Sequence, residues 1–169
     1  MIDTRIPLLS QDYTHVLSKD LSGDRGLIIV GVGRSGERGF QMLYRFSEVC
    51  ERLRECCVNV AFVYPKESSR HVLDSISLLS SKCKRGPAFL LDDNGRFFRD
   101  VQEAKSLRAI YLDHDMKYVG FTDVALQGEN WDALLHTFFA SAVSGAMAPI
   151  QSVRKSGRMK KLVTNVAGR

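Results

Sequence analysis

The chain has 169 residues, 44% hydrophobic and 25% charged, a composition typical of one globular domain with a buried core. No apolar run approaches the roughly 20 residues of a membrane-spanning helix. The segment Met1–Leu21 lacks a signal-peptide pattern, so we expect a cytoplasmic location. The formal net charge of +5 arises near the C-terminal end, because residues 150–169 include basic residues and no acidic one.

The first half of the chain predicts alternating strands and helices. Residues 1–24 are polar and weakly patterned, and we expect an N-terminal extension there. Leu27–Val32 is a continuous apolar run, typical of a strand buried on both faces. The apolar spacing over residues 37–56 predicts an amphipathic helix, and Val58–Tyr64 predicts the next strand, ended by Pro65. The apolar stripe of that helix comprises Phe40, Leu43, Tyr44, Phe46, Cys50, Leu53 and Cys57.

The second half continues with further strands and a closing helix. It first predicts a helix capped by Ser68 or Ser69, then a strand at Pro87–Leu91 and a turn at Asp92–Gly95. Two strands follow, at Leu107–Leu112 and Lys117–Thr122, joined by a turn at Asp113–Asp115. The last predicted element is a helix capped by Asn130. The residues of the last helix expected to face inward are Trp131, Leu134, Leu135, Phe138 and Phe139. The order indicates an α/β domain over residues 25–140, followed by a small-residue linker and tail over 141–169.

A glycine-rich turn follows the first apolar strand and opens the first helix. Gly31-x-Gly33-x-x-Gly36 in this position has the context of a dinucleotide fingerprint, with a pyrophosphate at the helix N-terminus. The acidic residue expected at the end of the second strand is missing, because that position reads Tyr64-Pro65-Lys66. Glu37 in the first helical turn would also repel an anion. A small nucleotide-binding protein is therefore an alternative interpretation, and a structural turn is favoured.

Several segments occur in the order of a known family. The helix opens at Gly33–Phe40 and continues through Phe46–Glu48, and the next strand contains Val58–Val60. Phe89–Gly95 and Leu107–Asp113 follow. This order resembles the peroxiredoxin (AhpC/TSA) version of the thioredoxin fold. That family carries P-x-x-x-T-x-x-C at the helix start, then a phenylalanine-serine-acid stretch and a V-x-V strand. The resemblance covers roughly residues 25–140 and implies a central sheet flanked by helices.

The catalytic positions of that family are degenerate in this chain. Gly33 takes the place of the proline, Glu37 that of the threonine and Phe40 that of the peroxidatic cysteine. Arg108 matches the family's active-site arginine and is either a remnant or a salt-bridge residue. In the alternative register of thioredoxin itself, Ser35–Arg38 takes the Cys-x-x-Cys place, again without a thiol. Peroxide reduction needs a thiolate of low pKa, which phenylalanine does not provide, so we expect no peroxidase activity.

The four cysteines are Cys50, Cys56, Cys57 and Cys83, and none forms a Cys-x-x-Cys pair or a metal motif with histidine. We expect Cys50 and Cys57 to fill core positions and Cys56 to end the helix. A redox thiol at Cys56, Cys57 or Cys83 is the alternative, and Cys83 has cationic neighbours that favour its thiolate. Asp113-His114-Asp115 reads as a hairpin turn, so neither a metal nor a cofactor is expected.

The C-terminal tail offers a basic surface for a polyanion or an acidic protein. Its candidate contact residues are Arg154, Lys155, Arg158, Lys160 and Lys161. A merely solubilising tail is equally compatible with this composition. The sequence therefore predicts a non-catalytic module for protein binding or dimerisation. In general plan it resembles the cysteine-less C-terminal dimerisation domains of flavin-dependent aromatic hydroxylases.

Overall fold

A buried strand of seven residues, β3 (Gly26–Val32), forms the centre of the molecule. The computed structural model describes residues 2–32, 37–66, 87–98, 106–126 and 129–145, with only the backbone for 37–44. All seven residues of β3 are buried, which explains why this part of the sequence is apolar without alternation. On one side β3 pairs in parallel with β4 (Val58–Pro65), and on the other it pairs antiparallel with β6 (Ser106–Leu112).

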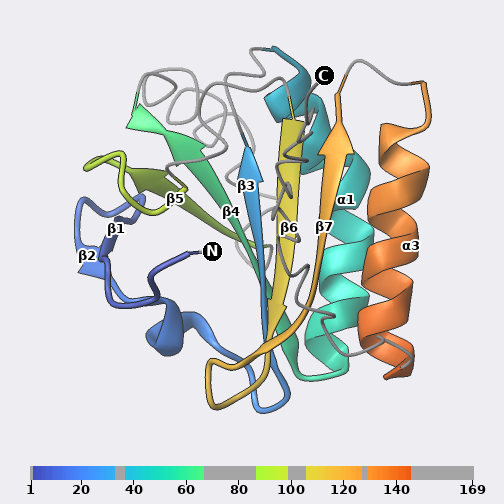
Figure 1. Cartoon of the computed structure of the whole chain (residues 1–169), viewed down its shortest axis with the longest axis horizontal. Helices are drawn as coiled ribbons and strands as arrows, with labels where there is room; N and C mark the ends of the chain where they lie inside the picture. Colours follow the sequence, from blue (N-terminus) through green and yellow to red (C-terminus); the bar gives the residue numbers. More distant parts are fainter. Residues whose placement is uncertain (1, 33–36, 67–86, 99–105, 127–128, 146–169) are drawn as a thin grey trace, which may run out of the picture.

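Within the described residues the sheet is mixed and has seven strands, in the order β2-β1-β5-β4-β3-β6-β7 (Figure 1). The remaining strands are β5 (Ala88–Asp92), parallel to β4; β7 (Tyr118–Ala125), antiparallel to β6; β1 (Leu8–Leu9), antiparallel to β5; and β2 (His15–Val16), antiparallel to β1. A short 3₁₀ helix, η1 (Ser18–Leu21), follows β2. The segment before residue 25, expected to be an extension, thus contributes two strands to the same sheet.

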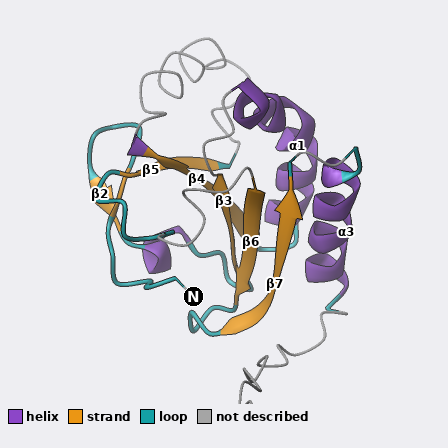
Figure 2. Ribbon diagram, turned by 45° about the horizontal axis from the view of Figure 1, so that its top comes forward, coloured by secondary structure: helices purple, strands orange, loops and turns teal. Residues whose placement is uncertain are grey.

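Two helices, α1 (Glu37–Glu55) and α3 (Trp131–Ser144), lie side by side on one face of the sheet (Figures 1 and 2). The Phe46 ring of α1 meets the Phe139 ring of α3 edge-on, with the ring centroids 5.6 Å apart. The Arg45 guanidinium in the middle of α1 donates to the Asp132 carboxylate in the first turn of α3 over 2.9 Å. No described helix has the length and apolarity that crossing a membrane requires.

The opposite face of the sheet is covered by the N-terminal segment and by the turn after β5. Ile2, Leu8, Phe97 and Phe98 pack here against side chains of the central strands. The Tyr118 hydroxyl of β7 fixes the N-terminal segment, because it accepts from the backbone N–H of Ile2 (2.8 Å) and donates to its carbonyl oxygen (3.0 Å). The segment before residue 25 is therefore part of the second hydrophobic layer.

The buried carboxylate of Asp92 shapes the turn after β5. It accepts hydrogen bonds from three backbone N–H groups, those of Arg96 (3.1 Å), Phe97 (3.0 Å) and Phe98 (3.2 Å). This arrangement confirms the predicted turn at Asp92–Gly95, in which Gly95 has φ +63°. It also directs both phenylalanines onto the sheet.

The predicted elements within the described residues are confirmed, with three corrections in side-chain placement. Asn130 stands at the start of α3 as expected, but its side chain makes no capping hydrogen bond. Leu134, expected to face inward, is 55% exposed, because α3 turns it away from the sheet while Leu135 is buried. Cys57, expected in the core, is exposed with φ +62°, because α1 ends at Glu55 and the chain then leaves the helical stripe. The helix expected after Ser68 or Ser69 lies outside the described residues, as does the tail over 146–169.

Candidate functional site at the carboxyl end of the central strand

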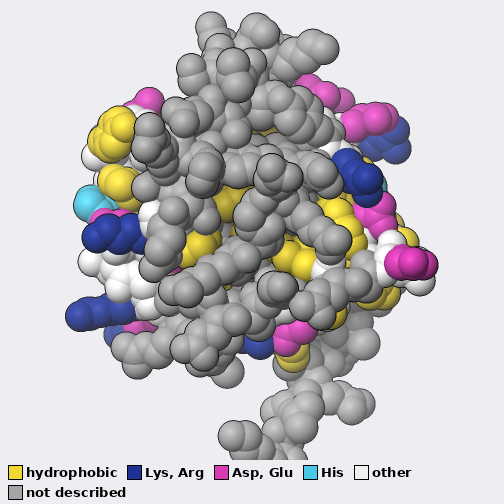
Figure 3. Space-filling model, turned by 90° about the horizontal axis from the view of Figure 1, so that it is seen from above, with side chains coloured by type: hydrophobic (Ala, Val, Ile, Leu, Met, Phe, Trp, Pro, Cys, Tyr) yellow, Lys and Arg dark blue, Asp and Glu magenta, His cyan; other side chains and the backbone are white. Residues whose placement is uncertain are grey.

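The sequence resemblance directs attention to the place where β3 ends and α1 begins. Gly33 lies outside the described residues, and Glu37 and Phe40 lie in the first turns of α1 with only their backbone described. Figure 3 views this end of the molecule and shows hydrophobic side chains near its middle, between segments that are not described. The expected burial of Phe40 therefore stays a prediction.

Arg108 lies at this same end of the sheet, because it is paired in register with Gly31 of β3. On the other side Arg108 is paired with Asp123 of β7, and the two side chains form a two-pronged ion pair. The guanidinium donates from Nε to Oδ1 over 2.6 Å and from Nη2 to Oδ2 over 2.9 Å. The Arg108 side chain is 24% exposed and that of Asp123 49%. A carboxylate thus balances the cation that matches the family's arginine.

Asp123 was missed by the sequence reasoning, although the sequence carries a signal for it. The turn at Asp113–Asp115 makes β6 and β7 a hairpin, so a residue early in β6 must face one late in β7. The one-residue irregularity near Tyr111 and Leu112 shifts the register, however, and no local pattern announces it.

The dinucleotide interpretation is tested most directly by Gly31. A Cβ at Gly31 would lie 2.7 Å from the Phe98 ring, so the space that this glycine leaves is used for packing. The neighbouring strand β6 also runs antiparallel to β3, whereas the dinucleotide motif belongs to a run of parallel βαβ units. Tyr64 and Pro65 close β4 as buried residues, and β4 itself contains no acidic residue. Gly33 and Gly36 lie outside the described residues.

The cysteines that are described differ sharply in exposure. Cys50 is buried inside α1, and this burial raises the pKa of its thiol to about 12. Cys56 is half-buried, and Cys57 is exposed directly after the helix. The backbone carbonyl of Cys57 accepts from the N–H of Arg25 over 2.9 Å, which holds this turn against β3. Cys83 lies outside the described residues.

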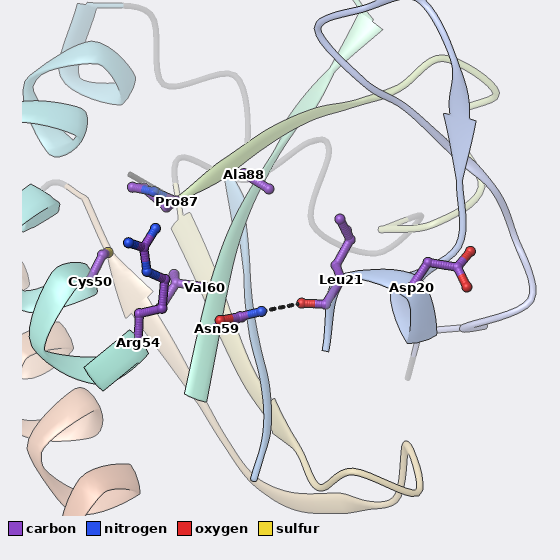
Figure 4. A pocket seen from close by; sticks show the side chains of 8 residues that line it. All are labelled: Asp20, Leu21, Cys50, Arg54, Asn59, Val60, Pro87 and Ala88. Atoms are coloured by element: carbon purple, nitrogen blue, oxygen red, sulfur yellow. Dashed lines mark hydrogen bonds between the residues drawn. The ribbon is translucent and has the colours of Figure 1, made fainter. Parts of the chain in front are cut away.

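A pocket of about 260 Å³ lies at the other end of the sheet, where β4 and β5 begin (Figure 4). Cys50 and Arg54 of α1 form one wall, and η1 forms the other. The Asn59 amide donates to the carbonyl oxygen of Leu21 over 2.8 Å. The complete lining is Asp20, Leu21, Cys50, Arg54, Asn59, Val60, Pro87 and Ala88. Because the Cys50 thiol stays protonated at neutral pH, this wall provides hydrogen-bonding groups and a cation, without a nucleophile.

The Asp113, His114 and Asp115 side chains bring three potential ligand atoms within 4.8 Å of one another. Asp113 Oδ1, however, accepts from the backbone N–H groups of Asp115 and Lys117, both over 2.9 Å. Asp115 in turn pairs with the Lys117 ammonium over 3.3 Å. These contacts are those of the predicted hairpin turn.

Comparisons with known proteins find similar structures but no matching sequence family. No family model matches the chain, and no curated protein matches its sequence. Peroxidoxin BcpB from Mycobacterium tuberculosis superposes with a TM-score of 0.63 at 13% identity, over 87% of this chain and 97% of that one.

Two further solved structures are also similar to this chain. Peroxiredoxin Q from Xanthomonas campestris gives a TM-score of 0.61 at 15% identity, over 84% and 97% of the two chains. A secreted disulfide oxidoreductase from Mycobacterium tuberculosis gives 0.59 at 9% identity, over 84% and 96%. The expected α/β class and thioredoxin-like sheet are thereby confirmed. The chain is a thioredoxin-fold protein whose structure resembles that of peroxiredoxins.

Proposed function

We propose that this chain is a non-catalytic thioredoxin-fold module that binds a protein partner or a second copy of itself. Its structural neighbours are peroxiredoxins and a disulfide oxidoreductase, so the fold is one used for redox chemistry. The observation that carries the proposal is that the first cysteine of the chain, Cys50, lies deep in α1 as a buried, protonated thiol. The helix start, where the resembling family has its nucleophile, has Phe40.

The ion pair between Arg108 and Asp123 supports the same conclusion. In a thiol peroxidase, a cation beside the nucleophile lowers the pKa of the thiol. Here the carboxylate of Asp123 faces the guanidinium directly and offsets its charge. Even a cysteine placed nearby would gain less from Arg108 than from an unopposed arginine. The described part of this end of the sheet favours packing and salt-bridge roles over peroxide reduction.

The basic tail and a cytoplasmic location complete this proposal. Five basic residues lie close together in the sequence of the tail, and their charge suits a second, acidic partner: Arg154, Lys155, Arg158, Lys160 and Lys161. Five such charges give a reversible, salt-sensitive attachment, at about 1 kcal/mol for each basic residue near an anionic surface.

The decisive experiment compares thiol-dependent turnover of hydrogen peroxide and of a disulfide substrate by the wild type and by a variant with all four cysteines changed to serine. We expect the wild type to show no turnover above the variant. Turnover that one single Cys→Ser change abolishes would overturn the proposal. Loss at Cys57→Ser would favour the alternative of a redox thiol, because Cys57 is the exposed cysteine among those described.

A further inference from the structure

The pocket at the beginning of β4 and β5 exists because β4 starts earlier along the sheet than its neighbour. β5 begins at Ala88, which is paired with Ala61, so residues 58–60 of β4 have no register partner in β5. Pro87 precedes β5 and has no backbone N–H to donate, so it does not extend the pairing. This part of β4 therefore borders the pocket, between α1 and η1 (Figure 4).

Asn59 presents a hydrogen-bond acceptor to this pocket. Its Nδ2 donates to the carbonyl oxygen of Leu21 over 2.8 Å, and because a carbonyl oxygen only accepts, this contact fixes which end of the amide is the oxygen. Figure 4 shows Oδ1 on the side of the amide away from Leu21. Within the described residues, Oδ1 has no hydrogen-bond partner. A ligand that donates an N–H to Oδ1 would satisfy this half-buried oxygen.

Arg54 brings a positive charge to the wall formed by α1. Figure 4 shows its guanidinium extending from the helix toward Pro87 at the beginning of β5. Arg54 has another interaction within the chain, but a guanidinium carries five N–H donors, so it can bind a ligand and keep a partner. Its planar fork matches a carboxylate, which accepts two parallel hydrogen bonds from it. The buried Cys50 thiol on the same wall stays protonated and adds no negative charge there.

The remaining lining is mostly apolar, and the pocket is small. Its aliphatic groups come from Leu21, Val60, Pro87 and Ala88. The volume of about 260 Å³ lies below the roughly 300–1,000 Å³ of pockets that hold drug-sized ligands. The pocket therefore suits a smaller molecule with an apolar side chain.

The charges at the pocket favour a single carboxylate over a phosphate group. Arg54 is the one cationic residue of the lining, and Asn59 Oδ1 would repel a second anionic oxygen. The carboxylate of Asp20, at the wall formed by η1, accepts from the backbone N–H of Leu17 over 3.3 Å and points away from Arg54 in Figure 4. Asp20 thus leaves Arg54 available to an anion, and adds a negative charge that disfavours a dianion.

We propose that this pocket binds the carboxylate end of an N-acylated apolar amino acid. The Arg54 guanidinium donates to the carboxylate, and the amide N–H on the adjacent carbon donates to Asn59 Oδ1. The apolar side chain packs against Val60 and Ala88. The last residue of a peptide has this same chemistry, so the ligand is either a free small molecule or the C-terminus of a partner protein. The second source rests on the proposed binding function.

Isothermal titration calorimetry of the full chain with N-acetyl-leucine tests this proposal. We expect saturable binding with a Kd of about 1 mM or below. N-acetyl-leucinamide, which lacks the carboxylate, should bind at least about tenfold more weakly. N-acetyl-glycine should also bind more weakly, because it lacks the apolar side chain.

Two arginine variants distinguish the pocket from general attraction to a basic helix. Arg54→Gln should weaken the binding of N-acetyl-leucine at least about tenfold. The matched control is Arg52→Gln, which removes an exposed guanidinium from the same helix, where it pairs with Glu48 outside the pocket lining. Arg52→Gln should leave the Kd unchanged.

NMR spectra of the backbone amides locate the ligand independently of any variant. The signals of Asn59, Val60 and Ala88 should shift on titration, while that of Arg108, at the opposite end of the sheet, should not. The absence of saturable binding, equal binding of the amide, equal losses in the two arginine variants, or shifts confined to the Arg108 end would each overturn the proposal.

A tetrapeptide that ends in leucine with a free carboxylate distinguishes the two sources of the ligand. Binding at least about tenfold tighter than that of N-acetyl-leucine would support the site and identify a protein C-terminus as its ligand. Equal binding would support the site and identify the free acid. Thiol-dependent peroxide turnover would refute only the non-catalytic function, because this pocket provides no nucleophile and lies away from Arg108.

Discussion

The backbone of Gly31 lies directly against the aromatic ring of Phe98. A Cβ on Gly31 would lie 2.7 Å from the Cε1 and Cζ atoms of that ring, which is closer than real Cβ contacts come. The ring is held there from the other side of the turn, because the Phe98 N–H donates to the buried Asp92 carboxylate over 3.2 Å. The first glycine of the apparent nucleotide motif therefore serves the packing of the second hydrophobic layer.

Gly31→Ala should lower the free energy of unfolding by about 1–3 kcal/mol, since the added methyl group must displace a buried ring. Urea denaturation measures this change. The same substitution in a Phe98→Leu background should cost clearly less, because the smaller side chain leaves room. An equal loss of unfolding free energy in both backgrounds would show that the Phe98 ring is not what opposes a side chain at position 31.

Asp92→Ala should destabilise the protein by about 1–3 kcal/mol or more, because three backbone N–H groups lose their acceptor in a buried place. Asp93→Ala is the control. Asp93 is adjacent, but its carboxylate accepts only at the surface, from the half-exposed His15 ring over 3.0 Å and from the Asn94 side-chain amide over 3.2 Å. An exposed pair of this kind contributes about 0–1 kcal/mol. Thermal unfolding distinguishes the two variants, and a larger loss for Asp93→Ala would contradict the assigned role of Asp92.

A disulfide reagent at neutral pH should modify Cys57 well before Cys50, which should react only when the chain unfolds. Mass spectrometry of quenched samples gives the order of modification. Rapid reaction of Cys50 under native conditions would contradict its burial.

The raised pKa of Cys50 also sets a dependence of stability on pH. The folded thiol keeps its proton up to about pH 12, whereas the unfolded thiol loses it from about pH 9. Between these values the folded state binds more protons, so stability falls as pH rises, by at most about 1.4 kcal/mol per pH unit. Burial raises the pKa of Tyr64 as well, and its contribution has the same sign. Cys50→Val should make the alkaline decline shallower in urea titrations, and an unchanged slope would exclude Cys50 as its source.

Truncation after Pro149 should leave the melting temperature unchanged and abolish salt-sensitive binding to polyanions. It removes six basic residues from a chain of net charge +5 and leaves the remainder near neutral. For the full chain, binding to nucleic acid should have a logarithmic salt slope no steeper than about five phosphates provide. Unfolding or aggregation of the truncated chain would show that tail residues stabilise the domain.

The long elements were predictable because their patterns are strong and local. The apolar run at Leu27–Val32 lies within β3, and the predicted helix differs from α1 by one residue at its end. The errors in the predicted structure lie at positions where the local structure depends on a single residue. Cys57 fits the helical spacing, but the helix ends two residues earlier. β1 and β2 were not predicted as strands, since two-residue strands have no period to detect.

The candidate site was predictable only in part, because its partners are distant in sequence. Arg108 was identified through a family resemblance, whereas its partner Asp123 depends on a register shift within the hairpin. The covering of Gly31 by Phe98 likewise depends on how the Asp92 turn folds back over the sheet. The predicted hairpin turn indicates the first relation without its register, and the second relation has no periodic or compositional signal.

The two hydrogen bonds between Tyr118 and Ile2 join residues 116 positions apart in the chain. A chain emerging from the ribosome makes Ile2 first and Tyr118 much later, so the N-terminal segment must wait for the last strand of the sheet before it can be fixed there. Contacts of such long range form at a high cost in loop-closure entropy and slow the search for the native state. During synthesis, the backbone of Ile2 therefore cannot be fixed at this place until β7 has been made.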